Sequence, residues 1–210
     1  CAVEDGQVYL AALLGGRWLL RGCARDRELR HEEEGLVRLI GDLAGMPLLQ
    51  PSAASGAAAI KLILAERGFK ASSDPEVLDV AIVGAGVAGI AAAIEAQRAG
   101  LRFAVYDATR AFATIADIPR RQRVHSDPAD VGSDGGLRLT ATNKIDLLVE
   151  VERQRVAAGI EPLVAQIERV ERKGRECLLH HADTSVTRTH HVLVAIGRRG
   201  IHRKLECPGG

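Results

Sequence analysis

A glycine turn between two apolar stretches is the feature that most constrains this chain of 210 residues. Gly84-Ala85-Gly86-Val87-Ala88-Gly89 follows an apolar run from Val77 to Val83 and precedes an alanine-rich stretch that predicts a helix from Ala88 to Arg98. A second apolar run, Phe103 to Tyr106, is followed at once by Asp107. A strand, a G-x-G-x-x-G turn, a helix and a strand that ends in an acid are together typical of a nucleotide-binding βαβ unit.

Each glycine of the turn has its own physical task. Gly84 permits the tight turn out of the strand, Gly86 lets the backbone approach a pyrophosphate, and Gly89 lets the helix pack close to the sheet. The start of the helix presents N–H groups and a partial positive charge to phosphates, and Asp107 can accept hydrogen bonds from ribose hydroxyls. The sequence therefore predicts a site for the ADP half of a dinucleotide, with binding residues Gly84, Ala85, Gly86, Val87, Ala88 and Gly89.

Composition narrows the class of protein. The chain is 47% apolar and 26% charged, which is enough to bury a core, and its net charge of +1 favours neither nucleic acid nor an anionic membrane as a partner. No apolar run reaches the ~20 residues of a membrane-spanning helix. The four cysteines form no C-x-x-C pair, which favours free thiols in a reducing cytoplasm over disulfides or a zinc site.

The order of elements predicts two segments, residues 1–76 and 77–210. After Asp107, an irregular region leads to a helix over 143–158. Three strand-like runs follow and predict an antiparallel meander: Leu163 to Arg172, Arg175 to His181, and Val186 to Ile196. The chain starts at Cys1 and stops in the turn-like sequence 207–210, so we expect it to be a piece of a longer protein.

Two histidine pairs in the meander, 180–181 and 190–191, raise the question of a metal site. If the hairpin turn centres on residues 183–184, His181 lies near Val186 and His190 faces Cys177. Adjacent residues of a strand point to opposite faces, so the pairs do not converge. We expect no metal site.

The chain from Leu78 to Gly210 resembles the FAD-binding half of the thioredoxin reductase-like flavoprotein oxidoreductases. Four pieces carry the resemblance: Asp79 to Val83 with the glycine turn; Ile94 to Gly100, followed by Asp107 where the family usually has Glu; the meander entered through Gly159-Ile160-Glu161; and Val194 to Gly200 with Arg203-Lys204-Leu205 and Pro208-Gly209. The fold this implies is α/β, a Rossmann-like FAD-binding domain with a parallel sheet and an antiparallel β-meander. The family's NAD(P)H domain would begin after Gly210 and is absent from this chain.

The resemblance also implies roles for individual positions. The glycine turn would cradle the FAD pyrophosphate, and Asp107 would hold the adenosine ribose, although Asp is shorter than Glu and would reach only one hydroxyl directly. Ile167 matches a position whose backbone contacts adenine. Gly197 matches a glycine that passes close to the flavin, and Thr114 falls where such proteins approach the pyrophosphate or the flavin.

A second, weaker resemblance lies upstream, over residues 36–68. In these reductases a strand ending in Gly-Asp, followed by a helix, closes the FAD domain at its C-terminal end, and its Asp contacts the ribityl-phosphate region. Here Leu39-Ile40-Gly41-Asp42 and a predicted helix from Pro47 to Arg67 stand before the glycine turn. Either this element completes the FAD site in a rearranged order, or it ends another module of a fused protein, or Asp42 is simply a helix cap.

The leading functional hypothesis is the FAD-binding portion of an NAD(P)H-dependent flavoprotein oxidoreductase. Electrons would pass from the nicotinamide through the flavin to a small-molecule or protein acceptor, and a homodimer is one arrangement open to such a protein. No catalytic side chain is identified. Two alternatives stay open: a dehydrogenase-type Rossmann domain that binds NAD, and a non-catalytic binding module that keeps the fold.

Overall fold

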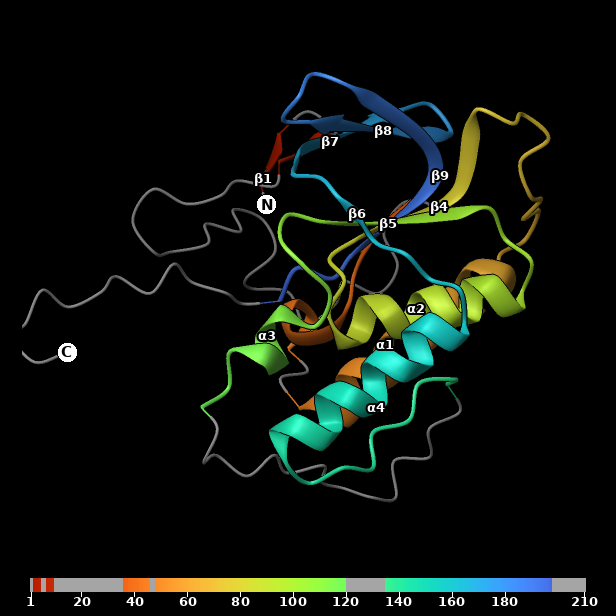
Figure 1. The fold of residues 1–210 in the computed structure, drawn as a ribbon. Coiled ribbons are helices and arrows are strands. Elements are labelled where there is room, and N and C mark those ends of the chain that lie inside the picture. The colour runs from red at the N-terminus through yellow and green to blue at the C-terminus, as the bar shows by residue number, and fades with distance from the viewer. Residues whose placement is uncertain (1, 5–6, 10–35, 46–47, 120–134, 198–210) are drawn as a thin grey trace, which may run out of the picture.

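The computed structural model describes residues 2–4, 7–9, 36–45, 48–119 and 135–197. Within them, nine strands form one sheet, with helices against one face (Figure 1). The strands are β1 (Ala2–Glu4), β2 (Gln7–Tyr9), β3 (Val37–Leu39), β4 (Val77–Val83), β5 (Phe103–Asp107), β6 (Leu163–Val164), β7 (Ile167–Lys173), β8 (Glu176–His181) and β9 (Val186–Val194). The helices are the 3-10 helix η1 (Gly41–Ala44), α1 (Leu49–Leu64), α2 (Val87–Arg98), α3 (Ala113–Ala116) and α4 (Lys144–Ala157).

The sheet combines a parallel part and an antiparallel part, which confirms the expected fold class. The parallel part has the order β6-β5-β4-β9-β3. Six of the seven residues of β4 are buried, because helices cover one face of this strand and the meander covers the other. A strand that is covered on both faces reads as a continuous apolar run, which is how β4 appears in the sequence.

Strand β9 joins the two parts. Its first residues, Val186 to Thr189, pair antiparallel with β8, whereas Val192 to Val194 pair in parallel with β3 on the same side. The meander of β7, β8 and β9 therefore folds back over the parallel sheet (Figure 1). Between them lies a second apolar cluster that includes Ala81, Val83, Val170, Cys177, Leu179, Val192 and Val194. Strands β1 and β2 extend the sheet beyond β7.

Helices α1, α2 and α4 lie on the opposite face of the parallel sheet from the meander (Figure 1). Helices α1 and α2 approach each other through small residues, and a Cβ atom at Gly56 would lie 2.1 Å from the carbonyl oxygen of Ala88. Asn143 caps α4 by accepting a hydrogen bond of 3.0 Å from the Asp146 N–H group. The main apolar core lies between these helices and the sheet.

The run from Leu163 to Arg172 was expected to be one strand of the meander, and this prediction is wrong. The structure divides it into β6, which pairs in parallel with β5, and β7, which pairs with β8. The Ala165 N–H group donates a hydrogen bond of 2.9 Å to the Asp107 carbonyl oxygen, so the chain leaves one sheet edge before it enters the meander. Pairing partners far apart in the sequence decide this break, and local periodicity does not record them.

The expected register of the last hairpin is also wrong by one residue. Cys177 faces Thr189 rather than His190, and Val186 faces His180 rather than His181. The difference arises at the turn, where Thr184 has a left-handed backbone (φ 71°). Two of the histidines contact neighbouring strand residues: His180 contacts Glu171 at 2.9 Å, and His181 contacts Thr187 at 2.9 Å.

Within the described ranges, no helix combines the length and the hydrophobicity needed to cross a membrane.

Candidate functional site

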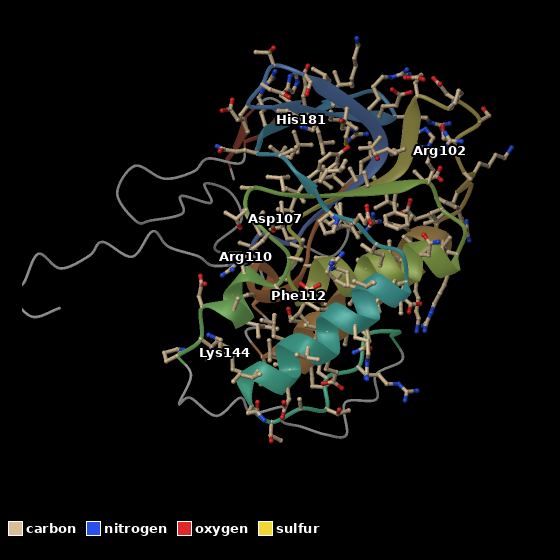
Figure 2. All side chains as sticks on the ribbon, viewed as in Figure 1. Arg102, Asp107, Arg110, Phe112, Lys144 and His181 are labelled. Carbon is tan, nitrogen blue, oxygen red and sulfur yellow. The ribbon has the colours of Figure 1, made fainter. Side chains whose placement is uncertain are left out.

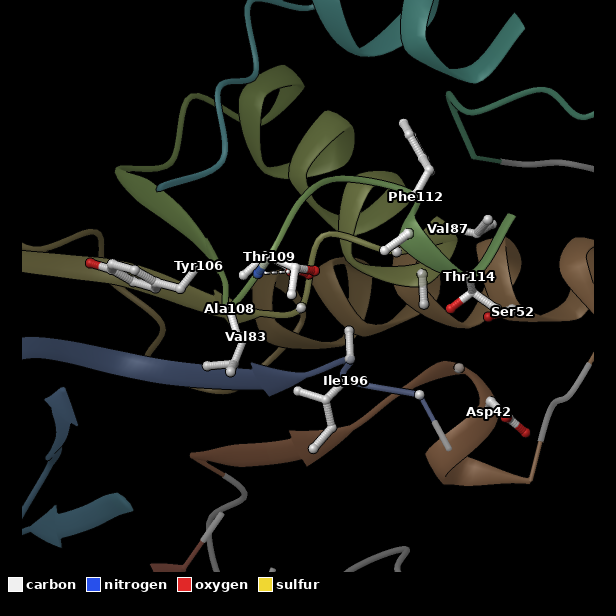
Figure 3. A pocket seen from close by; sticks show the side chains of 18 of the residues that line it. Asp42, Ser52, Val83, Val87, Tyr106, Ala108, Thr109, Phe112, Thr114 and Ile196 are labelled. Atoms are coloured by element: carbon white, nitrogen blue, oxygen red, sulfur yellow. Dashed lines mark hydrogen bonds between the residues drawn. The ribbon is translucent and has the colours of Figure 1, made fainter. Parts of the chain in front are cut away.

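A cavity of about 570 Å³ opens at the carboxyl ends of β4, β5 and β9 (Figure 3). Its walls come from the glycine turn and the start of α2, from the segment after β5, from the residues before β7 and after β9, and from η1 and the start of α1. This is the edge of a parallel sheet at which ligands of open α/β folds bind. The fold therefore brings distant parts of the sequence together at one position.

The glycine turn is held between the two strands next to β4. The Gly84 N–H group donates to the Tyr106 carbonyl oxygen at 2.7 Å, and the Ala195 N–H group donates to the Val83 carbonyl oxygen at 2.7 Å. Gly84 has a φ of 110°, and a Cβ atom there would lie 2.5 Å from the Ala195 carbonyl oxygen. Both the backbone angle and the lack of space require glycine at this position.

The other two glycines serve different purposes. A Cβ atom at Gly89 would lie 1.9 Å from the Gly84 carbonyl oxygen, so Gly89 lets α2 pack against the turn. Gly86 lines the cavity, and a Cβ atom there would meet nothing within 4 Å. The space beside Gly86 is thus open to a ligand, and the backbone can be approached closely.

The start of α2 has the properties of an anion site. Gly86 occupies the N-cap position, which has no side-chain cap, and the first turn contains no acidic residue. Val87 and Ala88 of this turn line the cavity. The first N–H groups of a helix have no partner inside the helix, and the helix dipole adds partial positive charge there. Phosphate is the ligand that such a terminus suits best.

Asp107 ends β5 and is tied to the turn. Its Oδ2 atom accepts a hydrogen bond of 2.8 Å from the Ala85 N–H group. Its Oδ1 atom accepts from the Thr109 N–H group at 2.8 Å and from the Thr109 hydroxyl at 3.1 Å. The carboxylate therefore both faces the cavity and fixes its geometry.

Phe112 connects the segment after β5 to the same turn. Its N–H group donates to the Ala85 carbonyl oxygen at 2.9 Å, and its own backbone is left-handed (φ 51°). Figure 2 shows Asp107 and Phe112 at either end of the segment that leads from β5 to α3. The turn at Phe112 starts α3 and brings Thr114 to the cavity wall. Left-handed backbone in a buried aromatic residue is uncommon and strained.

The upstream Gly-Asp element lies in the same cavity. Gly41 and Asp42 line it from η1, and Leu49 and Ser52 line it from α1. The φ of Gly41 is 69°, and a Cβ atom there would lie 2.8 Å from the Ala88 Cβ atom. The sequence left the position of this element open. In the structure Asp42 lies beside the glycine turn of the same chain, although β3 precedes β4 in the sequence.

The remaining predicted residues lie at the two ends of the cavity. Ile167 lines it together with Ala165 and Gln166, near the end of β5. Gly197, which has a φ of 67°, lines it after β9. The predicted positions that line the cavity are Asp42, Gly84, Gly86, Val87, Ala88, Asp107, Thr114, Ile167 and Gly197. Ala85 and Gly89 support the turn from behind through the contacts described above.

Several residues that line the cavity were not predicted from the sequence, among them Leu49, Ser52, Ala108, Thr109 and Phe112. Ser52 and Leu49 follow the Gly-Asp element at the start of a predicted helix, so their position gave a usable signal. Thr109 lies two residues after the strand-ending acid, where polar side chains commonly bond to Asp. No sequence signal marks Phe112, because aromatic residues rarely adopt a left-handed backbone.

Among the residues that the structure describes, Cys177 is the one cysteine. It lies under the meander rather than in the cavity. Burial raises the pKa of its thiol to about 11, and the nearby Arg172 opposes this shift. The thiol is therefore protonated at neutral pH. Cys1, Cys23 and Cys207, and the part of the family resemblance after Gly197, lie outside the described residues.

Comparison with known proteins places the chain in a family. The sequence model of the pyridine nucleotide-disulphide oxidoreductases matches residues 78–209. None of the curated proteins compared with the chain matches it.

Several solved structures are similar to part of the chain at low identity. The bacillithiol disulfide reductase of Staphylococcus aureus is 17% identical over 58% of this chain and 39% of its own, with a TM-score of 0.49. A flavin-containing monooxygenase from Stenotrophomonas maltophilia is 15% identical over 57% and 38% of the two chains, with a TM-score of 0.48. Thioredoxin reductase from Streptococcus pyogenes is 17% identical over 58% and 35%, with a TM-score of 0.43. The chain spans less than two fifths of the length of each of these proteins. Because the family model covers more than half of its residues, the chain belongs to the pyridine nucleotide-disulphide oxidoreductase family.

Proposed function

We propose that this chain is the FAD-binding part of a flavoprotein oxidoreductase that takes electrons from NAD(P)H and passes them to an acceptor. The observation that carries the proposal is the cavity itself, because it joins the glycine turn, Asp107, Gly197 and the upstream Gly41-Asp42 element. Family membership supports the same reading. Several points stay predictions. They are the acceptor, which would be a small molecule or a protein, the choice between NADH and NADPH, a homodimer, and a cytoplasmic location.

The extent of the cavity favours a long, two-part ligand. One end lies at the close of β5, with Tyr106 and Ala108, and the other lies at Asp42 and Ser52 (Figure 3). The start of α2 lies between the two ends. A dinucleotide has this form, since a central pyrophosphate joins a nucleoside at one end to a second ring system at the other. The phosphate-binding part of the site is thus in the middle, where the ligand requires it.

Backbone N–H groups would bind the pyrophosphate. Among the residues that the structure describes, those that line the cavity include no Lys and no Arg. The N–H groups at the start of α2 supply the hydrogen bonds, and the helix dipole supplies partial positive charge. Gly86 keeps side-chain atoms out of this position. The protein in this way binds the anion through backbone groups that are already in place before the ligand arrives.

The adenosine end and the flavin end would be bound by different segments. Asp107 and the chain from Ala165 to Ile167 form the adenosine end. The other end is formed by Gly197, by Gly41 and Asp42 of η1, and by Leu49 and Ser52 of α1. A bound flavin supplies hydride acceptance and electron transfer, and the protein supplies its placement and the exclusion of water. The cavity has apolar walls at Val83, Ile115 and Ile196 that favour a planar ring system.

The experiment is a binding comparison with the 210-residue chain. Purified protein should carry a flavin absorption spectrum or take up added FAD, and it should bind FAD more tightly than FMN or NADH. Gly86→Val places a side chain in the open space beside the turn and should abolish FAD uptake while the fold is retained. Ala99→Val places the same valine side chain at the exposed C-terminal end of the same helix and should change nothing. A chain that prefers NADH to FAD would overturn the proposal in favour of an NAD-binding domain.

A further inference from the structure

The hydrogen bonds of Asp107 restrict what its carboxylate can still accept. An ionised carboxylate has about four lone-pair sites, two on each oxygen. Both sites on Oδ1 are used, one by the Thr109 N–H group at 2.8 Å and one by the Thr109 hydroxyl at 3.1 Å. One site on Oδ2 is used by the Ala85 N–H group at 2.8 Å. Among the residues that the structure describes, no other group bonds to this carboxylate, so a single acceptor site remains, on Oδ2.

A ribose presents two neighbouring hydroxyl groups, and each of them is a donor. With one site left, Asp107 can accept only one of the two hydroxyls. A hydroxyl side chain has one donor and two acceptor lone pairs. Since the Thr109 hydroxyl already donates to Asp107, both of its lone pairs are available to accept. Thr109 is exposed and lines the same cavity beside Asp107.

We propose that Thr109 is the second ribose receptor of this site, and that Asp107 and Thr109 share the diol between them. Asp107 Oδ2 accepts one hydroxyl, and Thr109 Oγ1 accepts the other. The hydrogen bond from Thr109 to the carboxylate orients the hydroxyl so that its lone pairs face away from Asp107. This inference rests on the proposed function only in that a nucleotide occupies the cavity; it does not depend on the flavin.

The arrangement also explains how a short acidic residue can serve this position. Asp107 is drawn toward the turn by Ala85 and toward its own loop by Thr109, so its carboxylate cannot move outward to span both hydroxyls. The second acceptor comes instead from the side chain two residues further along. The Ala108 side chain between them is exposed and small, which leaves room for the sugar (Figure 3).

The test measures nucleotide binding by the 210-residue chain, using ADP, 2′-deoxy-ADP and 3′-deoxy-ADP in calorimetric titrations. Thr109→Val keeps the shape of the side chain and removes its hydroxyl. It should weaken ADP binding by about tenfold, which is the value of one net hydrogen bond. It should not weaken the binding of the one deoxy analogue that lacks the hydroxyl facing Thr109. Thr109→Ser should restore ADP binding, and Thr142→Val, an exposed threonine outside the cavity, should leave it unchanged.

Two outcomes would overturn the inference while leaving the proposed function in place. One is wild-type affinity of Thr109→Val for ADP, and the other is an equal loss for all three nucleotides, which would mean that Thr109 only supports the loop. If the unaltered chain binds ADP with the expected pattern but takes up no FAD, the inference stands and the proposed function fails. If it binds neither ADP nor FAD, both are wrong.

Discussion

Gly56 of α1 and Ala88 of α2 are in backbone contact: a Cβ atom on Gly56 would lie 2.1 Å from the Ala88 carbonyl oxygen. Ala88 also lines the cavity, as do Leu49 and Ser52 near the start of α1. The packing of the two helices therefore sets the distance between the glycine turn and the part of the cavity wall that η1 and α1 form, which we call the upstream wall.

Gly56→Val should separate the two helices and weaken both the fold and the binding site. Overpacking of a tight core contact costs about 1–3 kcal/mol. We expect the free energy of unfolding in urea to fall by that amount and the affinity for FAD to fall with it. Ala58→Val is the matched control, because residue 58 is exposed on the same helix. Equal stabilities of the two variants would show that α1 is not held by this contact.

Phe112 allows a test of backbone strain. Phe112→Ala and Phe112→Gly both remove a buried ring, at a cost of about 3–5 kcal/mol. Glycine has no Cβ atom and adopts the observed φ of 51° without the penalty of about 1–2 kcal/mol that other residues incur. The glycine variant should therefore be the more stable of the two in urea unfolding. If alanine is the more stable, the left-handed turn at Phe112 does not persist in solution.

His191 should make stability depend on pH. It is buried on β9, and burial lowers the pKa of its imidazole. Glu66 opposes this shift, Arg38 and His190 add to it, and Asp79 opposes it weakly.

Because the folded-state pKa lies below the unfolded value of 6.5, the unfolded chain binds the proton more readily. The stability that His191 contributes is thus fully present above pH 6.5, and it is lost as the pH falls toward the folded-state pKa. Between pH 7 and pH 5, the melting temperature of His191→Gln should fall less than that of the unaltered chain. A slope equal to that of the unaltered chain would assign the pH dependence to other groups.

Cys177 should resist alkylation until the protein unfolds. Its thiol is fully buried, and burial raises its pKa to about 11, so little thiolate is present at pH 8. Iodoacetamide followed by peptide mass spectrometry should show Cys177 unmodified in the native chain and fully modified in guanidinium. Rapid modification under native conditions would mean that the meander opens far more often than its packing indicates.

The sequence was a reliable guide where structure depends on neighbours along the chain. The strand at 77–83, the turn after it and the helix to Arg98 are all as expected, because an apolar run, a glycine pattern and a helical alanine stretch are local signals. The break between Val164 and Ile167 was missed because it depends on pairing with β5, which lies far away in the sequence.

The site shows the same division. Asp107 was identifiable from its place after a strand, but the use of its lone pairs was not, since that depends on where Ala85 and Thr109 come to lie. The position of Asp42 in the cavity was likewise open. It is decided by β3 pairing with the last residues of β9, and a motif read along the chain cannot say which strand it will join.

Ser55 holds the upstream wall of the cavity in place, and its removal should affect stability and binding together. Its Oγ atom accepts a hydrogen bond of 2.9 Å from the Gly41 N–H group and donates one of 2.7 Å to the Ser52 carbonyl oxygen. Gly41 is buried, so Ser55→Ala leaves its N–H group without this acceptor, at a cost of about 1–3 kcal/mol.

We expect that cost to appear in urea unfolding and the affinity for FAD to fall as well, because Gly41 and Asp42 lie on the cavity wall. The matched control is Ser73→Ala, an exposed serine in the connection before β4. ADP binding should change less than FAD binding, since the upstream wall lies at the opposite end of the cavity from Asp107. An equal loss for ADP and FAD would show that Ser55 supports the whole fold and not one end of the site.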